Sequence, residues 1–185
     1  SRALMKQHDI PIYDKIEDAL TLGTGKLAVD GVLLVAEHGK YPKNETGNVI
    51  WPKREMFEAI TKVFRDSKAS VPVFCDKHLA DNWGDAKWFH QTARELKVSL
   101  MAGSSLPGLW RKPPVDVKRG AKLTQMVAIS YHTLDAYGFH AIEMVQCLAE
   151  RRAGGESGVR QVRCLSGDAV WEALADGMID EELLQ

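Results

Sequence analysis

The segment VPVFCDKHLA, which spans Val71–Ala80, contains the change of pattern that decides the fold. Residues 71–75 are apolar and have the length of a strand, whereas the three residues that follow, Asp76-Lys77-His78, are all ionisable. A helix-like pattern begins soon afterwards, with Asp81 or Asn82 as its cap and an apolar face that continues to about residue 96. We therefore predict a buried strand that ends in a polar loop and is followed by a helix.

The same alternation of strands and helices extends on both sides of this segment. Apolar runs at 29–36 and 98–102 have strand length, and Pro52 suits the first turn of a helix with one apolar face. Short connections between such elements are typical of βαβ units in a parallel sheet. The apolar run at 29–36 favours a strand that is covered on both faces. We therefore predict an α/β fold with a Rossmann-like parallel sheet.

The chain opens with SRALMKQHDIPIYD, without a methionine and without a signal-peptide pattern. Its first residues resemble the end of a helix, and residues 10–13 form a candidate strand before a helix that Asp14 would cap. We therefore expect the chain to begin partway through a fold.

The pattern changes after Pro113-Pro114. The predicted elements beyond this point are a strand at 123–131, a helix at 135–152, a strand at 159–165 and a helix at 168–175. We place the domain boundary in the linker-like stretch at 106–116. The predicted domains are a nucleotide-binding-type domain at 1–110 and part of an α+β substrate or oligomerisation domain at 111–185.

The composition indicates a globular protein and excludes several classes. Hydrophobic residues make up 45% of the 185 residues and charged residues 26%, which differs from the composition of a disordered chain. A net charge of -1 gives no basic excess for nucleic acid, and no apolar run approaches the roughly 20 residues of a membrane-spanning helix. The three cysteines, Cys75, Cys147 and Cys164, are few and far apart, as expected for reduced thiols in a cytoplasmic protein.

Polar and small residues follow each of the long predicted strands, where an open parallel sheet binds its ligands. These residues are Glu37-His38, Asp76-Lys77-His78 and Gly103-Ser104. A lysine that is partly desolvated at a strand end has its pKa lowered towards the range in which it exchanges protons with a substrate hydroxyl. Lys77 has this position, although Asp76 beside it would favour the charged form. A surface lysine in an ion pair is the alternative interpretation.

Two motifs resemble the glucose-fructose oxidoreductase and inositol dehydrogenase family. The segments KLAVDGVLLVAEHGKYP and VPVFCDKHLADNWGDAKWFHQTARELKVSLMAGSSLP are similar to the second half of the family's nucleotide-binding domain, in which a strand ends in Glu-Lys-Pro before Leu-Ala. Here the triplet is Asp76-Lys77-His78. The stretch DAYGFHAIE is similar to the family's Asp-x-Gly-x-His-x-x-Asp motif, with Gly138, His140 and Glu143 in matching places and Asp135 one position early.

The resemblance implies an oxidoreductase that uses NAD or NADP and acts on a hydroxyl of a sugar or cyclitol. Lys77 would polarise the hydroxyl and His140 would exchange its proton. The full set of expected site residues is Lys77, His140, Asp76 and His78 for catalysis, Glu37, His38 and Gly103 for the cofactor, and Ser104, Trp110, Asp135 and Tyr137 for the substrate. We also expect a homo-oligomer with a small carbohydrate-like substrate.

The family's Gly-x-Gly-x-x-Gly loop occurs nowhere in the chain. The predicted sheet therefore lacks its first βαβ unit, and we expect the chain to be a piece of a longer relative. Two other functions stay open. One is a non-catalytic Rossmann-like binding or assembly module. The other is a metal-dependent carbohydrate hydrolase, lyase or isomerase that uses His38, His78, His132 and His140. Nucleophilic catalysis by Cys75 is less favoured, because a cysteine at the end of an apolar strand is usually inert.

Overall fold

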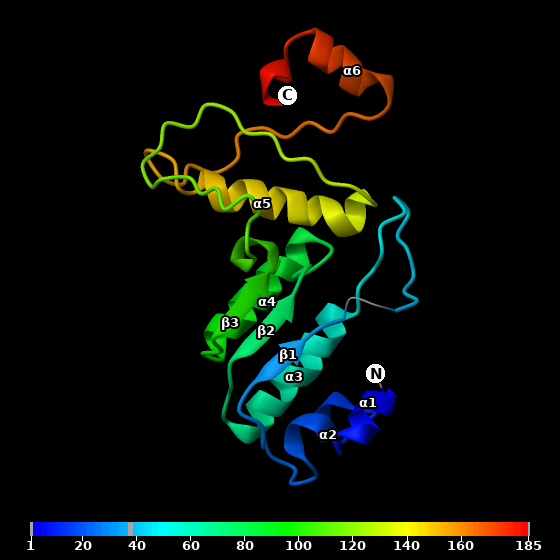
Figure 1. Ribbon diagram of the computed structural model, residues 1–185. Coiled ribbons are helices and arrows are strands. Elements are labelled where there is room, and N and C mark those ends of the chain that lie inside the picture. Colours follow the sequence, from blue (N-terminus) through cyan, green and yellow to red (C-terminus); the bar gives the residue numbers. More distant parts are fainter. Residues whose placement is uncertain (1, 37–38, 185) are drawn as a thin grey trace. The chain divides into compact units, whose positions relative to one another are not determined.

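The computed structural model describes residues 2–36 and 39–184, which divide after Ser104 into two compact units. Each unit is described here by itself (Figure 1). The prediction that the two parts are a nucleotide-binding half and a substrate half stays a prediction.

The first unit is built around a parallel sheet of three strands, so the predicted α/β class is confirmed. The strands are β1 (Val32–Leu34), β2 (Val73–Asp76) and β3 (Leu100–Gly103), in the spatial order β1-β2-β3. Helix α3 (Lys53–Ser67) connects β1 to β2, and α4 (Trp83–Glu95) connects β2 to β3. These are two successive βαβ units, because each parallel strand needs a crossover before the next.

The two crossover helices begin where the sequence predicts, and α4 ends close to the predicted residue 96. Pro52 precedes α3, and the side-chain oxygen of Asn82 accepts a hydrogen bond from the Asp85 N–H in the first turn of α4. Phe57 of α3 stacks on Phe89 of α4 with ring centroids 4.4 Å apart, and both side chains are fully buried. The core of the unit lies between these helices and one face of the sheet, where Leu34, Val73 and Cys75 are buried (Figure 1).

The other face of the sheet is open. Leu33, Phe74 and Met101 pair across the three strands in one row. Leu33 is 77% exposed and Met101 is 65% exposed. The prediction that the strand at 29–36 is covered on both faces is therefore wrong, and the strand itself is limited to three residues. An apolar run shows that side chains can be buried, but another element must be present to bury them.

Two short helices precede the sheet. Helix α1 comprises Arg2–Gln7, and α2 comprises Ile16–Thr21, packs against α3 and buries Leu20. The predicted strand at 10–13 is wrong, since these residues have no ladder partner in the described part of the chain. Within residues 2–36 and 39–184, no helix combines the length and the apolar character that crossing a membrane requires.

The second unit contains helices joined by long irregular segments. Its elements are a 3-10 turn η1 (Leu106–Gly108), a π-helical turn η2 (Leu134–Gly138), α5 (Phe139–Ala149), α6 (Asp168–Ala175) and a 3-10 turn η3 (Glu181–Leu184). The helix predicted at 168–175 is confirmed, and the one at 135–152 is observed as η2 and α5.

The strands predicted at 123–131 and 159–165 are wrong. Among the described residues of this unit the one β contact is the isolated bridge between Ala121 and Arg152, and neither segment belongs to a ladder. Alternating side chains favour an extended backbone, but a strand exists only when a neighbour accepts its hydrogen bonds. α5 has no buried residue, and Ala173 of α6 is the only buried apolar residue in the described part of this unit.

Candidate functional site at the carboxyl ends of the strands

The central strand β2 delivers the predicted ionisable triplet to the carboxyl edge of the sheet. Asp76 is its last residue and is half-buried, while Lys77 follows it and is only 4% exposed. Asp76 pairs with Gly103 of β3 in the register of the sheet, and Ser104 comes next in the chain. Four predicted site residues, Asp76, Lys77, Gly103 and Ser104, therefore gather at one edge, as the carboxyl ends of parallel strands must.

Lys53, which sequence analysis did not single out, fixes the backbone around Lys77. It is the first residue of α3 and is 1% exposed. Its Nζ donates hydrogen bonds to the carbonyl oxygen of Asp76 and, at 2.7 Å, to that of Lys77. These two carbonyl groups belong to the peptide groups before and after the Cα atom of Lys77. One buried ammonium group therefore holds the backbone on both sides of that atom. No sequence signal distinguishes this lysine from those that point to solvent.

His78 lies beside an aromatic pair that sequence analysis also missed. The Trp51 ring lies 6.2 Å from the His78 ring at an interplanar angle of 31°, and Tyr41 meets Trp51 edge to face at 5.4 Å. Both aromatic residues come from the segment between β1 and α3. A tight turn lies in the same segment, where Asn44 Oδ1 accepts hydrogen bonds from the backbone N–H groups of Thr46 and Asn48. The edge therefore combines cationic, imidazole and aromatic side chains.

Neither the start of α4 nor the glycines before β1 offer a cradle for the pyrophosphate of a nicotinamide nucleotide. A cradle needs a strand, a glycine-rich turn and then the free N-terminus of a helix. The first turn of α4 is filled by Asn82 and by the carboxylate of Asp85, which also binds Arg54 at 2.7 Å. Gly23 and Gly25 follow α2 and precede β1, which is the wrong order. The predicted cofactor residues Glu37 and His38 lie outside the described residues, so Gly103 alone is placed at this edge.

Cys75 is unsuited to nucleophilic catalysis. Its side chain is fully buried in β2. Burial raises the pKa of the Cys75 thiol, Asp76 adds to this effect, and the nearby Lys53 only partly opposes it. The thiol form is therefore favoured, and it is a poor nucleophile.

The second unit brings the predicted residues Tyr137 and His140 together. The Tyr137 ring lies 4.7 Å from the His132 ring and 6.1 Å from the His140 ring, and Tyr131 packs against it at 6.0 Å. The π-helical turn η2 creates this cluster, with Asp135 half-buried inside the turn and His140 in the first turn of α5. His140 is half-buried, as expected for a residue at the border of the apolar stripe.

Three other expectations concern the pairing of Lys77 with His140, the position of Trp110 and the histidine-based metal site. The expected partners Lys77 and His140 belong to different units, so their pairing stays a prediction. Trp110 is 92% exposed and has no ring contact within the described ranges. The described residues contain no group of three or more His, Cys, Asp or Glu side chains that could hold a metal ion, so the histidine-based metal site has no support there.

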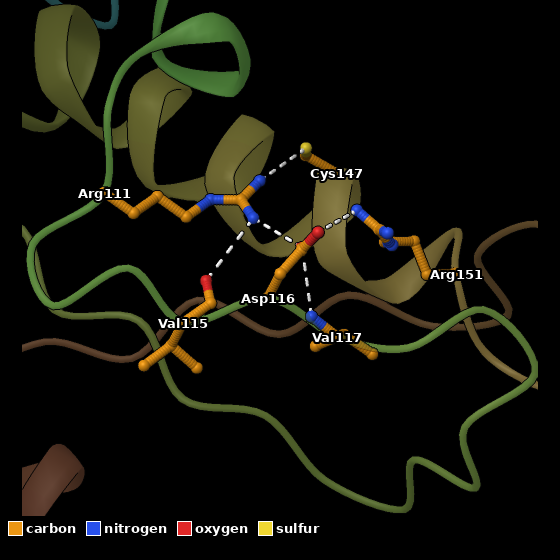
Figure 2. A network of polar contacts seen from close by, with 6 residues as sticks. All are labelled: Arg111, Val115, Asp116, Val117, Cys147 and Arg151. Atoms are coloured by element: carbon orange, nitrogen blue, oxygen red, sulfur yellow. Dashed lines mark hydrogen bonds and ion pairs between the residues drawn. The ribbon is translucent and has the colours of Figure 1, made fainter.

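A carboxylate between two guanidinium groups links the start of the second unit to the end of α5 (Figure 2). Asp116 accepts from Arg111 at 2.6 Å and pairs with Arg151 at 2.6 Å, and the Val117 N–H also donates to it at 3.0 Å. Burial on its own would raise the pKa of Asp116, but the Arg111 hydrogen bond and the Arg151 charge outweigh it and hold the pKa below its ordinary value.

Comparisons with protein-family models, with curated proteins and with solved structures find no match for this chain. The interpretation of the site therefore depends on its residues and their geometry.

Proposed function

We propose that the carboxyl edge of the sheet binds the substrate of an NAD(P)-dependent oxidoreductase that acts on a hydroxyl of a sugar or cyclitol. The observation that carries this proposal is the position of Lys77. It is buried directly after the central strand, and Lys53 holds the carbonyl groups on both sides of it. A cation held in this way at the ligand-binding edge of a parallel sheet suits an oxygen that gains negative charge as a hydroxyl is deprotonated.

The neighbouring side chains support a polyhydroxylated substrate. Trp51 and Tyr41 present aromatic surface beside His78, and such surface packs against the apolar C–H face of a sugar or cyclitol ring. Gly103 and Ser104 are small; Gly103 is the last residue of β3, which pairs with β2, and Ser104 follows it. Cationic and aromatic groups next to small residues match the combination of a few polar contacts with apolar surface that is found in small-molecule sites.

Proton transfer is assigned to two groups. Oxidation of a hydroxyl releases its proton, and the side chain that accepts it must lie within hydrogen-bond reach. In the proposal Lys77 polarises the hydroxyl oxygen, and His140 of the second unit accepts the proton, as the resemblance to the oxidoreductase family implies. The contact of His140 with Tyr137 supports this role, because packing restricts the orientation of the imidazole.

In this proposal the described residues of the chain bind the substrate. The first turn of α4 is occupied by Asn82 and Asp85, and we assign no step to the nucleotide here. The few, dispersed cysteines support a reducing, cytoplasmic setting, and we propose a homo-oligomer as in the family that the motifs resemble.

The experiment is calorimetry of the complete polypeptide with NAD, NADP, glucose and myo-inositol, followed by turnover measurements. We expect Lys77→Met to weaken carbohydrate binding about tenfold, which corresponds to one lost charge-assisted hydrogen bond. Lys87→Met, at an exposed position of α4, serves as the matched control and leaves binding unchanged. If the complete polypeptide binds neither nucleotide, the oxidoreductase assignment is wrong.

The lack of a pyrophosphate cradle at the start of α4 favours a second candidate. This is a binding module that uses the same edge of the sheet but catalyses no reaction. Such a module binds the carbohydrate through Lys77 but shows no turnover with either nucleotide. Carbohydrate binding that is sensitive to Lys77→Met, together with no nucleotide binding, would favour the module. Nucleotide-dependent turnover that is lost in Lys77→Met would exclude it.

A further inference from the structure

The second unit contains a hollow of about 390 Å³ lined by three guanidinium groups and one carboxylate. It lies at the end of α5, and its lining residues are Arg119, Gly120, Cys147, Glu150, Arg151 and Arg152. Its volume falls within the range of small-molecule sites. This feature is independent of the edge of the sheet to which the proposed function is assigned.

Arg151 has donor capacity that the described residues leave unused. Its Nη1 pairs with Asp116, but its Nε is buried and has no hydrogen-bond acceptor among them. Buried donors are almost always satisfied by protein, water or a ligand, so this N–H needs an acceptor. Asp116 is not available as an acceptor for the Nε–H group, because its oxygens already accept from Arg111, from Nη1 of Arg151 and from the Val117 N–H.

Arg119 is brought to the same hollow by a turn that is tied to the end of α5. The Gly120 N–H donates to the Arg151 carbonyl at 2.7 Å, and the Ala153 N–H donates to the Ala121 carbonyl at 2.8 Å. Gly120 has φ +81°, which a glycine adopts without strain. Arg119 itself is exposed and forms no ion pair with any described residue. Two backbone hydrogen bonds therefore hold a free cation beside Arg151.

The remaining charges leave the hollow positive. Arg152 donates to the Ala149 carbonyl and to Ser157 Oγ, both at 2.9 Å, and it pairs with Glu156 at 3.6 Å, so its charge is partly balanced and it has few free donors. Glu150 is the one acidic side chain of the lining. An anion with several acceptor oxygens and two charges would satisfy Arg119 and Arg151 together. A phosphate monoester has this charge near neutral pH, and its oxygens match the fork of a guanidinium group.

We propose that this hollow binds the phosphate group of a small phosphorylated metabolite. The phosphate oxygens accept hydrogen bonds from Arg119 and from the part of the Arg151 guanidinium that lines the hollow, while Arg152, which is paired with Glu156, lies at its border. The site involves binding only, with no bond made or broken.

The test is titration of the full chain with inorganic phosphate, followed by calorimetry and by phosphorus NMR. We expect saturable one-to-one binding that weakens about tenfold in Arg119→Gln, because a charge-assisted contact is lost. Lys122→Gln removes the same charge close by in the chain but outside the hollow, so it changes binding less than about twofold at moderate salt. Arg151→Lys keeps the charge and removes the fork, and we expect it to weaken binding as well.

Three results would overturn the proposal. The first is an absence of saturable phosphate binding, and the second is an equal loss in Arg119→Gln and Lys122→Gln, which would show only diffuse attraction. The third is displacement of phosphate by an equal concentration of acetate, which would indicate a carboxylate site. The Arg119 side chain is exposed and forms no hydrogen bond or ion pair with a described residue, so Arg119→Gln remains informative even if Arg151→Lys fails to fold.

Discussion

Replacement of Lys53 by methionine tests how the carboxyl edge of the sheet is held. Lys53 is 1% exposed, and its ammonium group donates to the carbonyl oxygens of Asp76 and Lys77. Methionine has a similar length and stays buried, but it cannot donate a hydrogen bond. The variant therefore removes the donor and leaves the carbonyl groups in place.

The expected loss follows from the two carbonyl groups. A buried acceptor that loses its partner costs roughly 1–3 kcal/mol, so two of them would cost about 2–6 kcal/mol. Methionine is easier to bury than an ammonium group, and this difference offsets part of the loss. We expect the free energy of unfolding to fall by about 2–4 kcal/mol.

The assay is urea unfolding of the complete chain, followed by circular dichroism and tryptophan fluorescence. The matched control is Lys62→Met on the same helix, where the lysine is solvent-exposed and pairs only with Asp66. Exposed pairs of this kind contribute little, so the control should unfold at nearly the wild-type urea concentration. If Lys53→Met and Lys62→Met have the same unfolding midpoint, the role assigned to Lys53 is wrong.

Three further predictions concern other parts of the chain. The folded-state pKa of Asp116 is lowered, so its contribution to stability is present above the ordinary aspartate pKa and is lost as pH falls through the folded value. The urea midpoints of wild type and Asp116→Asn should therefore converge in acid. A difference between the two midpoints that stays constant with pH would contradict this. Cys164 is exposed and should react with a thiol reagent at once, whereas Cys75 should react only on unfolding, as peptide mapping by mass spectrometry would show. Phe57→Ala should destabilise the chain by about 3–5 kcal/mol in urea unfolding, and Leu33→Ala on the open face should cost far less; equal losses would mean that this face is covered.

The parts of the fold that the sequence predicted depend on local patterns. The helices that begin after Pro52 and Asn82 have a local start signal and one apolar face, and both lie close to their predicted positions. The strands between them follow from apolar runs of the right length. Their parallel arrangement follows because each crossover carries a helix. The same pattern predicts that Lys77 lies at the carboxyl edge of the sheet.

The errors in the sequence analysis concern elements that depend on distant partners. The segments at 123–131 and 159–165 alternate as strands do, but no neighbour pairs with them in the described part of the chain. The run at 29–36 is mostly apolar, yet one face of its strand is open. Intrinsic preference favours an extended backbone in all these segments, whereas pairing and coverage depend on residues far away in the chain.

The sequence by itself therefore determined the βαβ alternation, the caps of the crossover helices and the delivery of Asp76 and Lys77 to one edge. Only the tertiary structure decided that Lys53 reaches the carbonyl groups around Lys77, and that Arg119 lies beside Arg151 at the end of α5. The physical reason is the range of the interactions. Capping and apolar periodicity act within a few residues, but the direction of a long cationic side chain is set by acceptors that the fold brings to it from elsewhere in the chain.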